Sequence, residues 1–334
     1  MTWAPRAVPA SPYWIAAKWI VLMASALLYA SLLLVPDISA RLFWYGLIPI
    51  LPALFLINAE LWRNVCPLAT LSTLREPEAM TQPLTRTGAR WWTGFGILLF
   101  LTLVPFRHAL FDQSGPATAM LLGAAAACAL VGGLLRDRKA GFCNSICPIL
   151  PVERLYGQRP LTRVENARCA PCRACTHHAC FDLNPERSGL VSIGAPARGR
   201  GWVGTPFGAF ALALPGFVSA FYLAPGMTSR LSLPDGLLGV YIAVLIGAAA
   251  SWLLLSGAAT LLSVRPARAL PGAAGLAVTA YYWFTPAAVA RVWALDPAWV
   301  LILRILTLSL VGVWLFRAFS RDSEASLVPV RFEP

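Results

Sequence analysis

Six of the eight cysteines lie between positions 143 and 180. The first two form a C-x3-C-P pattern at Cys143, Cys147 and Pro148, and the other four form C-x2-C-x2-C-x4-C from Cys169 to Cys180. Bacterial ferredoxins hold iron–sulfur clusters with cysteines at successive two-residue gaps and a further cysteine before a proline, because the short gaps let the chain wrap one face of a cubane. The spacing therefore predicts a ferredoxin-like segment.

Zinc is the alternative metal for these cysteines. Tetrahedral zinc binds Cys and His at similar spacings, and His177 and His178 lie just before Cys180. Zinc sites usually use paired C-x2-C knuckles, whereas three cysteines in C-x2-C-x2-C favour a cubane. The sequence thus favours iron and sulfide, and a zinc-stabilised membrane scaffold subunit of a larger complex is an alternative from a different functional class.

Seven cysteines are candidate ligands, and that number limits how clusters can be built, because two [4Fe–4S] clusters held only by cysteine need eight thiolates. One arrangement joins the C-x2-C-x2-C triplet to Cys147 or Cys66. Another places the four remaining cysteines on one cluster and the triplet on a second. In that second cluster His177, His178 or Asp182 is the fourth ligand, or the cluster holds only three irons. A single cluster with spare thiols is the third. We expect one or two iron–sulfur clusters of the [4Fe–4S] type, with these candidate ligands: Cys66, Cys143, Cys147, Cys169, Cys172, Cys175 and Cys180.

The elements that carry these cysteines are predicted to be membrane helices. Of the 334 residues, 58% are hydrophobic and 13% are charged, whereas about 25% of the residues of a soluble domain are charged. Repeated apolar runs of roughly 20 residues are long enough to cross a bilayer as helices. The sequence predicts an all-α polytopic membrane protein with about eight transmembrane helices, over residues 14–35, 42–60, 91–106, 117–135, 204–224, 237–262, 270–290 and 299–316.

Details within these spans predict local structure. Pro49 and Pro52 predict a kink in the second span, and the many Gly and Ala residues of the fourth predict close helix packing. Cys128, inside the fourth span, is interpreted as a packing residue. The chain is expected to divide into transmembrane helices 1–4 with the Cys66 loop (1–135), a cytoplasmic iron–sulfur loop (136–203), transmembrane helices 5–8 (204–317) and a cytoplasmic tail (318–334).

The distribution of basic residues predicts the orientation. The net charge is +12, with 27 Lys and Arg. The connections opposite the termini hold only Arg41, Arg107, Arg230 and Arg291, and Arg304 lies within the eighth span, so the other 22 basic residues share the side of the termini and both cysteine loops. By the positive-inside rule that side is cytoplasmic. We therefore expect a multi-pass protein of the bacterial inner membrane, with its cysteine loops in a reducing compartment that disfavours disulfides. The charge then requires no nucleic-acid partner.

Two similar turns indicate an internal repeat. Residues 63–67 read Arg-Asn-Val-Cys-Pro and residues 144–148 read Asn-Ser-Ile-Cys-Pro, and each follows an outward-and-back helical hairpin. Trp62 occupies the position that corresponds to Cys143. The first turn therefore offers one thiol where the second offers two.

The cysteine patterns resemble those of the membrane polyferredoxin family, which includes the NapH, NosR, MauN and CcoG-type proteins. The matching positions are the C-x3-C-P pattern from Cys143, the Cys-Pro turn at Cys66 and the triplet from Cys169, so the resemblance covers roughly residues 42–182. Trp62 in place of a cysteine, a single ferredoxin-type segment and the lack of a proline after its last cysteine are departures. The resemblance implies cytoplasmic cluster-binding turns and quinol-linked electron transfer, and it does not reach the last four spans.

An iron–sulfur cluster at the cytoplasmic face exchanges single electrons and needs a source or an exit within the membrane. The chain has three histidines, two of them in the cysteine loop, so a bis-histidine haem within the spans is excluded and a quinone is the simplest partner. Charge at membrane depth is more often functional than charge elsewhere. Glu60, at the cytoplasmic end of the second span, and Arg304, inside the eighth, are therefore candidates for a quinone or proton site. The structural alternatives are that Glu60 caps the interface or pairs with Arg63, and that Arg304 snorkels or pairs with a helix-end carbonyl.

We expect an electron carrier rather than a stand-alone enzyme. It would relay single electrons between a quinone pool or a cytosolic donor and a partner redox protein or larger membrane complex. The arginines around the cysteine loop would attract an acidic ferredoxin-like donor. The alternative is a metal reductase or a maturation factor for a respiratory metalloenzyme.

Overall fold

The computed structural model describes residues 11–74, 84–136, 138–162, 164, 166–167, 180–182, 185–193, 200–228 and 233–320. The cysteine triplet and both histidines of the loop lie outside these ranges, namely Cys169, Cys172, Cys175, His177 and His178. The predicted ligands that the structure describes are therefore Cys66, Cys143, Cys147 and Cys180.

Every element in the described ranges is helical. The long helices are α1 (Pro12–Leu34), α3 (Ile50–Val65), α5 (Arg86–Phe106), α6 (Gly115–Leu135), α9 (Pro206–Thr228), α10 (Leu233–Leu261), α11 (Pro266–Val292) and α12 (Pro297–Ser320). The shorter elements are α2 (Pro36–Leu42), α4 (Pro67–Ser72), α7 (Leu150–Tyr156), α8 (Pro185–Ile193), the π-helical segments η1 (Phe43–Leu47) and η2 (Arg107–Phe111), and the 3-10 segments η3 (Arg138–Ala140) and η4 (Arg200–Gly204). The predicted all-helical fold is confirmed.

Six helices of the described chain are long and apolar enough to cross a membrane, which supports a multi-pass membrane protein. They cover Pro12–Leu34, Thr87–Phe111, Gly115–Leu135, Pro206–Ala224, Gly236–Leu261 and Pro297–Ser320. A seventh crossing is present if the bent pair Pro36–Leu47 and Ile50–Val65 counts as one span. The number eight stays a prediction.

The helix in the position of the predicted seventh span, α11, is not among these six. It packs against α9 and α12, and Ala274, Ala277 and Val278 on it are fully buried. A helix that other helices shield from lipid needs less hydropathy than one that faces lipid, so its small residues and its two internal prolines are tolerated. The composition of α11 thus reflects an interior position in the bundle.

The bent pair contains the kink predicted in the second span. Its two parts meet at 53° at a break beside Pro49. Proline has no N–H to continue the helix. Pro52 lies in the first turn of α3, where the missing N–H costs nothing.

A second interruption lies near the end of α3, at Asn58, whose φ of −170° and ψ of 120° are extended. The carbonyls that this break releases are paired from a distant segment, because the N–H of Leu161 donates to Leu56 O at 3.2 Å and that of Thr162 donates to Ile57 O at 3.0 Å. The Asn58 side chain also donates to Thr162 O at 2.8 Å. Irregular backbone at membrane depth is tolerated where protein satisfies its polar groups, as it does here.

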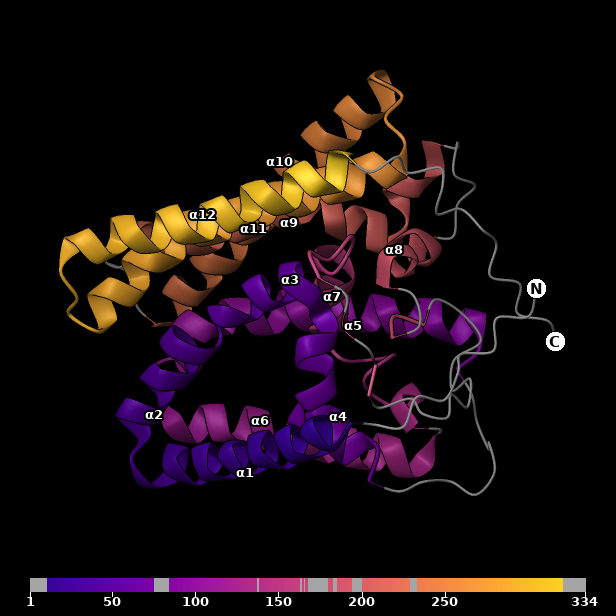
Figure 1. Ribbon diagram of the computed structural model, residues 1–334. Coiled ribbons are helices and arrows are strands. Elements are labelled where there is room, and N and C mark those ends of the chain that lie inside the picture. The colour runs from indigo at the N-terminus through magenta and orange to yellow at the C-terminus, as the bar shows by residue number, and fades with distance from the viewer. Residues whose placement is uncertain are drawn as a thin grey trace.

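The helices form two groups joined by α3, α5 and α7 (Figure 1). In one group α9 packs closely on α10, and α11 lies between α9 and α12. In the other, α1 and α4 pack against α6. The largest buried core runs from α3 and α7 into α9, α11 and α12, where the fully buried Trp314 donates to Gln158 O at 3.1 Å. The cysteine-bearing turns lie where the two groups meet.

Close backbone contacts hold one of these groups together, as the Gly-rich fourth span predicts. A Cβ atom built on Gly133 of α6 would lie 2.2 Å from Ser72 O at the end of α4. One built on Gly132 would lie 2.8 Å from Gly141 O, two residues before Cys143. Two adjacent glycines of α6 therefore let the backbones next to both cysteine turns approach it.

Candidate metal centre

Each Cys-Pro turn joins a longer segment to a short helix. Cys66 ends α3, with its N–H donating to Trp62 O at 2.7 Å, and Pro67 begins α4, where proline is favoured because its missing N–H is not needed. In the second turn the N–H of Cys147 donates to Phe142 O at 3.1 Å, and α7 begins at Leu150. The local sequence thus places Cys66 at a helix boundary and Cys147 three residues before one.

The two turns bring three predicted ligands into one packed group. Cys143 is 7% exposed and packs with Ala69, Ala129 and Phe142, and both Cys66 and Cys147 lie against this group. We call the three cysteines with these apolar neighbours the cysteine core. Sequence reasoning placed Cys66 on the same face as the second turn, and the structure brings it into contact with that turn.

Burial favours the protonated thiol in the cysteine core. Burial raises the pKa of Cys143 to about 12, and Cys66 adds to the rise while Arg63 and Lys139 oppose it. Burial and the nearby Glu153 raise the pKa of Cys147 well above its ordinary value. Thiols bind metal as thiolates, so positive charge from metal is what would ionise these desolvated groups.

The arrangement does not match a site for one ion. Among the described residues, no three His, Cys, Asp or Glu side chains are grouped so that they could hold a single metal ion.

Cys180 lies partly exposed beside charged residues. It interacts electrostatically with Arg154 of α7. The next residue, Phe181, is fully buried, and the guanidinium of Arg63 lies 5.0 Å from the centre of its ring. Anchoring of Phe181 and of the following Asp182 thus fixes the position of Cys180.

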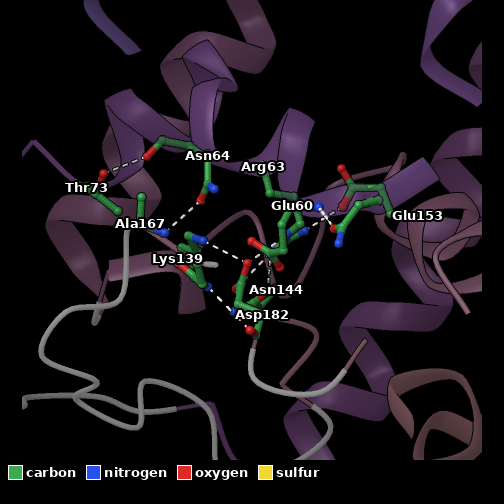
Figure 2. A network of polar contacts seen from close by, with 12 residues as sticks. Glu60, Arg63, Asn64, Thr73, Lys139, Asn144, Glu153, Ala167 and Asp182 are labelled. Atoms are coloured by element: carbon green, nitrogen blue, oxygen red, sulfur yellow. Dashed lines mark hydrogen bonds and ion pairs between the residues drawn. The ribbon is translucent and has the colours of Figure 1, made fainter. Parts of the chain in front are cut away.

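Arg63 is the centre of a buried group of polar side chains (Figure 2). Its Nε and Nη2 donate to the two carboxylate oxygens of Asp182 at 2.6 and 3.0 Å. Its Nη1 donates to Glu153 Oε2 at 2.5 Å, and Nη2 also donates to Asn144 Oδ1 at 2.9 Å. Lys139 Nζ donates to Asp182 Oδ1 at 2.8 Å. We call these five residues the charge network.

Asp182 is fixed as an anion within the charge network. Burial alone would raise its pKa, but Arg63 and Lys139 lower it far below its ordinary value. Both of its carboxylate oxygens accept hydrogen bonds from these cations. Asp182, considered from sequence as a fourth ligand for the triplet, is thus bonded to Arg63 and Lys139 in this structure.

The charge network joins α3 to three later segments of the chain. Arg63 comes from α3, Asn144 from the second cysteine turn, Glu153 from α7 and Asp182 from the segment after Cys180. Sequence reasoning did not identify these residues as a network, although Arg63 and Asn144 had been noted in the two similar turns. The matching positions of Arg63 and Asn144 in the two turns are the sign of this network that the sequence offers.

The contacts support the internal repeat. Arg63 and Asn144 stand at the same distance before the Cys-Pro pair in their turns, and they bond to each other. In addition α4, which follows the first turn, packs on α6, whereas α7, which follows the second, packs on α3. Such an exchange of partners is what two copies related by an approximate two-fold axis would make.

The two charged residues predicted at membrane depth have different surroundings. Glu60 is 3% exposed, and neither carboxylate oxygen has a hydrogen-bond partner in the described part of the chain. Arg304 donates from Nε to Trp283 O at 2.8 Å, and its guanidinium lies 4.5 Å from the Trp283 ring centre. Arg304 therefore ties α12 to a carbonyl within α11 rather than to one at a helix end.

An apolar groove opens beside the second cysteine turn. Its volume is about 380 Å³, and α5, α6 and the turn line it with residues that include Trp92, Cys128, Leu135, Ser145 and Ile146. Cys128 is exposed there rather than packed in the interior as the sequence interpretation had it.

Comparisons of this chain with protein-family models, curated proteins and solved structures found no match.

Proposed function

We propose that this chain is a membrane-integral iron–sulfur protein that relays single electrons between a quinone pool or a cytosolic donor and a partner redox protein. The observation that carries the proposal is the convergence of Cys66, Cys143 and Cys147 in one apolar core at the meeting point of two helix groups. One buried and two partly buried thiols beside buried cations are a donor set suited to iron and sulfide.

The chain's own residues would hold and tune the centre. Cys66, Cys143 and Cys147 are ligands, and Cys180 with the C-x2-C-x2-C triplet supplies the rest for one or two clusters. When bound, an iron–sulfur cluster supplies reversible one-electron transfer. Arg63 and Lys139 provide positive charge, which favours the reduced state, and the apolar neighbours exclude water, which affects the potential.

The apolar groove supports a quinone as the membrane partner. It lies between α5 and α6 and reaches Ser145 and Ile146, next to Cys147. An isoprenoid quinone in it would have its ring close to the cysteine core and its tail in the bilayer. The basic residues around the cysteine turns, on the side proposed to be cytoplasmic, would attract an acidic redox partner.

The test is metal analysis of the full-length protein purified without oxygen. We expect iron and acid-labile sulfide in similar amounts and an EPR signal of a reduced iron–sulfur cluster. Cys66→Ser should lose part of the iron and alter that signal, whereas Cys128→Ser, the matched change at an exposed cysteine, should not. Stoichiometric zinc without iron would exclude the proposal and favour the scaffold alternative.

The quinone step has its own test. Cys128→Trp should fill the groove and slow the reduction of the centre by a quinol analogue, while reduction by dithionite stays unchanged. Met120→Trp, a matched change at a lipid-facing position of the same helix, should leave both rates as they are. Equal rates of reduction by the quinol analogue in the wild type and both variants would mean that the quinone binds elsewhere or is not a partner of this protein.

A further inference from the structure

Glu60 is an exception among the buried acids around the charge network. Glu153 and Asp182 each accept hydrogen bonds from Arg63, and Asp182 accepts another from Lys139. Glu60 is equally buried, yet both of its carboxylate oxygens lack a partner among the described residues. A buried carboxylate without hydrogen bonds is costly, and a proton is the smallest partner that relieves that cost.

The surroundings of Glu60 set what a proton would do there. The charged groups that face it are Arg63 on its own helix, Lys139 before the second cysteine turn, Glu153 on α7 and Asp182 after Cys180 (Figure 2). Arg154, also on α7, belongs to the same group of charges. With Glu60 ionised, three buried anions face three buried cations, and the balance is sensitive to any added charge.

Glu60 can gain a proton without breaking a bond, whereas its two acidic neighbours cannot. A proton on Asp182 or Glu153 would disrupt their ion pairs with Arg63 and Lys139. The cations themselves are fixed by those pairs, so they cannot move to neutralise a new negative charge. Arg63, Lys139 and Asp182 act electrostatically both on Cys143 and on Glu60, so they link Glu60 to the cysteine core. Glu60 is therefore the acid beside the charge network that can compensate an electron added at the cysteine core at low cost.

We propose that Glu60 is a proton-binding site whose occupancy follows the redox state of the cysteine core, an inference that rests on the proposed iron–sulfur function. For each electron that a quinol or a reduced ferredoxin-like donor would deliver to a cluster held by the cysteine core, Glu60 would take up one proton from the solvent, so that its carboxylate becomes a carboxylic acid. When the acceptor removes the electron, Glu60 releases the proton. While the electron is held, the proton on Glu60 balances its charge.

The experiment is an EPR-monitored redox titration of the full-length protein in nanodiscs at a series of pH values. In the range where Glu60 titrates, we expect the midpoint potential to fall by about 59 mV for each tenfold drop in proton concentration, the value for one proton per electron. Glu60→Gln should remove this dependence. Asp37→Asn, the matched change at an exposed acid of α2, should retain it.

A second readout needs no substitution. The infrared difference spectrum of reduced minus oxidised wild-type protein should contain a carboxylic-acid C=O band that shifts in heavy water. A pH-independent potential in the wild type, a slope that survives in Glu60→Gln, or the absence of that band would overturn the role of Glu60 while leaving the iron–sulfur function intact. Protein without iron would instead overturn the function on which the inference rests.

Discussion

At the scale of single residues, the Arg63 side chain joins more parts of the site by its contacts than any cysteine does. One guanidinium binds Asp182, Glu153 and Asn144 and lies over Phe181, so it joins the first cysteine turn to the second and to the segment that holds Cys180. Lysine has the same charge but lacks the planar set of donors that makes several bonds at once. The site therefore depends on arginine at this position and not only on positive charge.

Arg63→Ala is expected to destabilise the protein by about 3–5 kcal/mol, because it leaves two buried carboxylates without their partner. Arg63→Lys should fall between the wild type and the alanine variant, since a point charge restores part of the attraction. Thermal unfolding in detergent, followed by the fluorescence of the buried tryptophans, measures both. A lysine variant as stable as the wild type would show that charge alone suffices.

The ion pair of Asp182 also predicts how stability depends on pH. Because Arg63 and Lys139 lower its pKa in the folded protein, its contribution is fully present above the ordinary pKa of about 3.9 and is lost as the pH falls below it. We expect the Tm to decline progressively below about pH 5. Asp182→Asn should have a lower Tm at neutral pH and a weaker decline in acid. Asp296→Asn, at an exposed acid, should follow the wild type.

At the scale of elements, the glycine pair of α6 sets the spacing on which the cysteine core depends. An alanine at position 133 would put its Cβ 2.2 Å from the carbonyl oxygen of Ser72, a backbone atom that cannot rotate away. The end of α4 would have to move, and α4 begins at the residue after Cys66. Packing of α4 on α6 is therefore part of how the first turn meets the second.

Gly133→Ala is expected to cost about 1–3 kcal/mol through overpacking and to lower the iron content. Gly94→Ala makes the same change in α5, where nothing lies within 4 Å of the new Cβ. That control should be neutral or up to about 1 kcal/mol more stable, because alanine favours helix over glycine. Unfolding and iron analysis of both variants make the comparison, and equal behaviour would argue against the close contact.

Local sequence was sufficient to predict the helices but not the way α3 is interrupted near its end. A long apolar run favours a helix wherever it packs, so all eight predicted segments are helical to within a few residues at most ends. The break at Asn58 has no such local cause, since it depends on Leu161 and Thr162 about a hundred residues later. The ion pair between Arg63 and Asp182 is equally non-local, so the cysteines were predictable from spacing and their charged surroundings were not.

At the scale of the whole molecule, the two groups of helices meet at the cysteine turns, and the basic residues place that meeting point on the proposed cytoplasmic side. The connection from α10 to α11 at Ser263 and the one from α11 to α12 at Asp296 should then face opposite compartments. Both positions are exposed, so their accessibility to a reagent can report the orientation.

In a Cys128→Ser background, Asp296→Cys is expected to react with a membrane-impermeant maleimide added outside spheroplasts, and Ser263→Cys to react only after the membrane is opened. The reason is the positive-inside asymmetry, which is a property of the entire chain rather than of one loop. The reverse pattern of labelling would put the cysteine turns outside. Equal labelling at positions 263 and 296 would contradict a membrane crossing by α11, the helix between them.

The hydrogen bonds from Leu161 and Thr162 to the broken turn of α3 also constrain biosynthesis. While the ribosome is still making α5 and α6, the carbonyls of Leu56 and Ile57 have no partner, and an unpaired backbone group in lipid costs several kcal/mol. The second transmembrane hairpin must therefore be inserted, and the loop beyond α7 synthesised, before the first hairpin can reach its final structure. A nascent chain arrested before residue 161 should remain protease-sensitive at α3. The two helical hairpins that precede the cysteine turns therefore depend on each other from the time the protein is made.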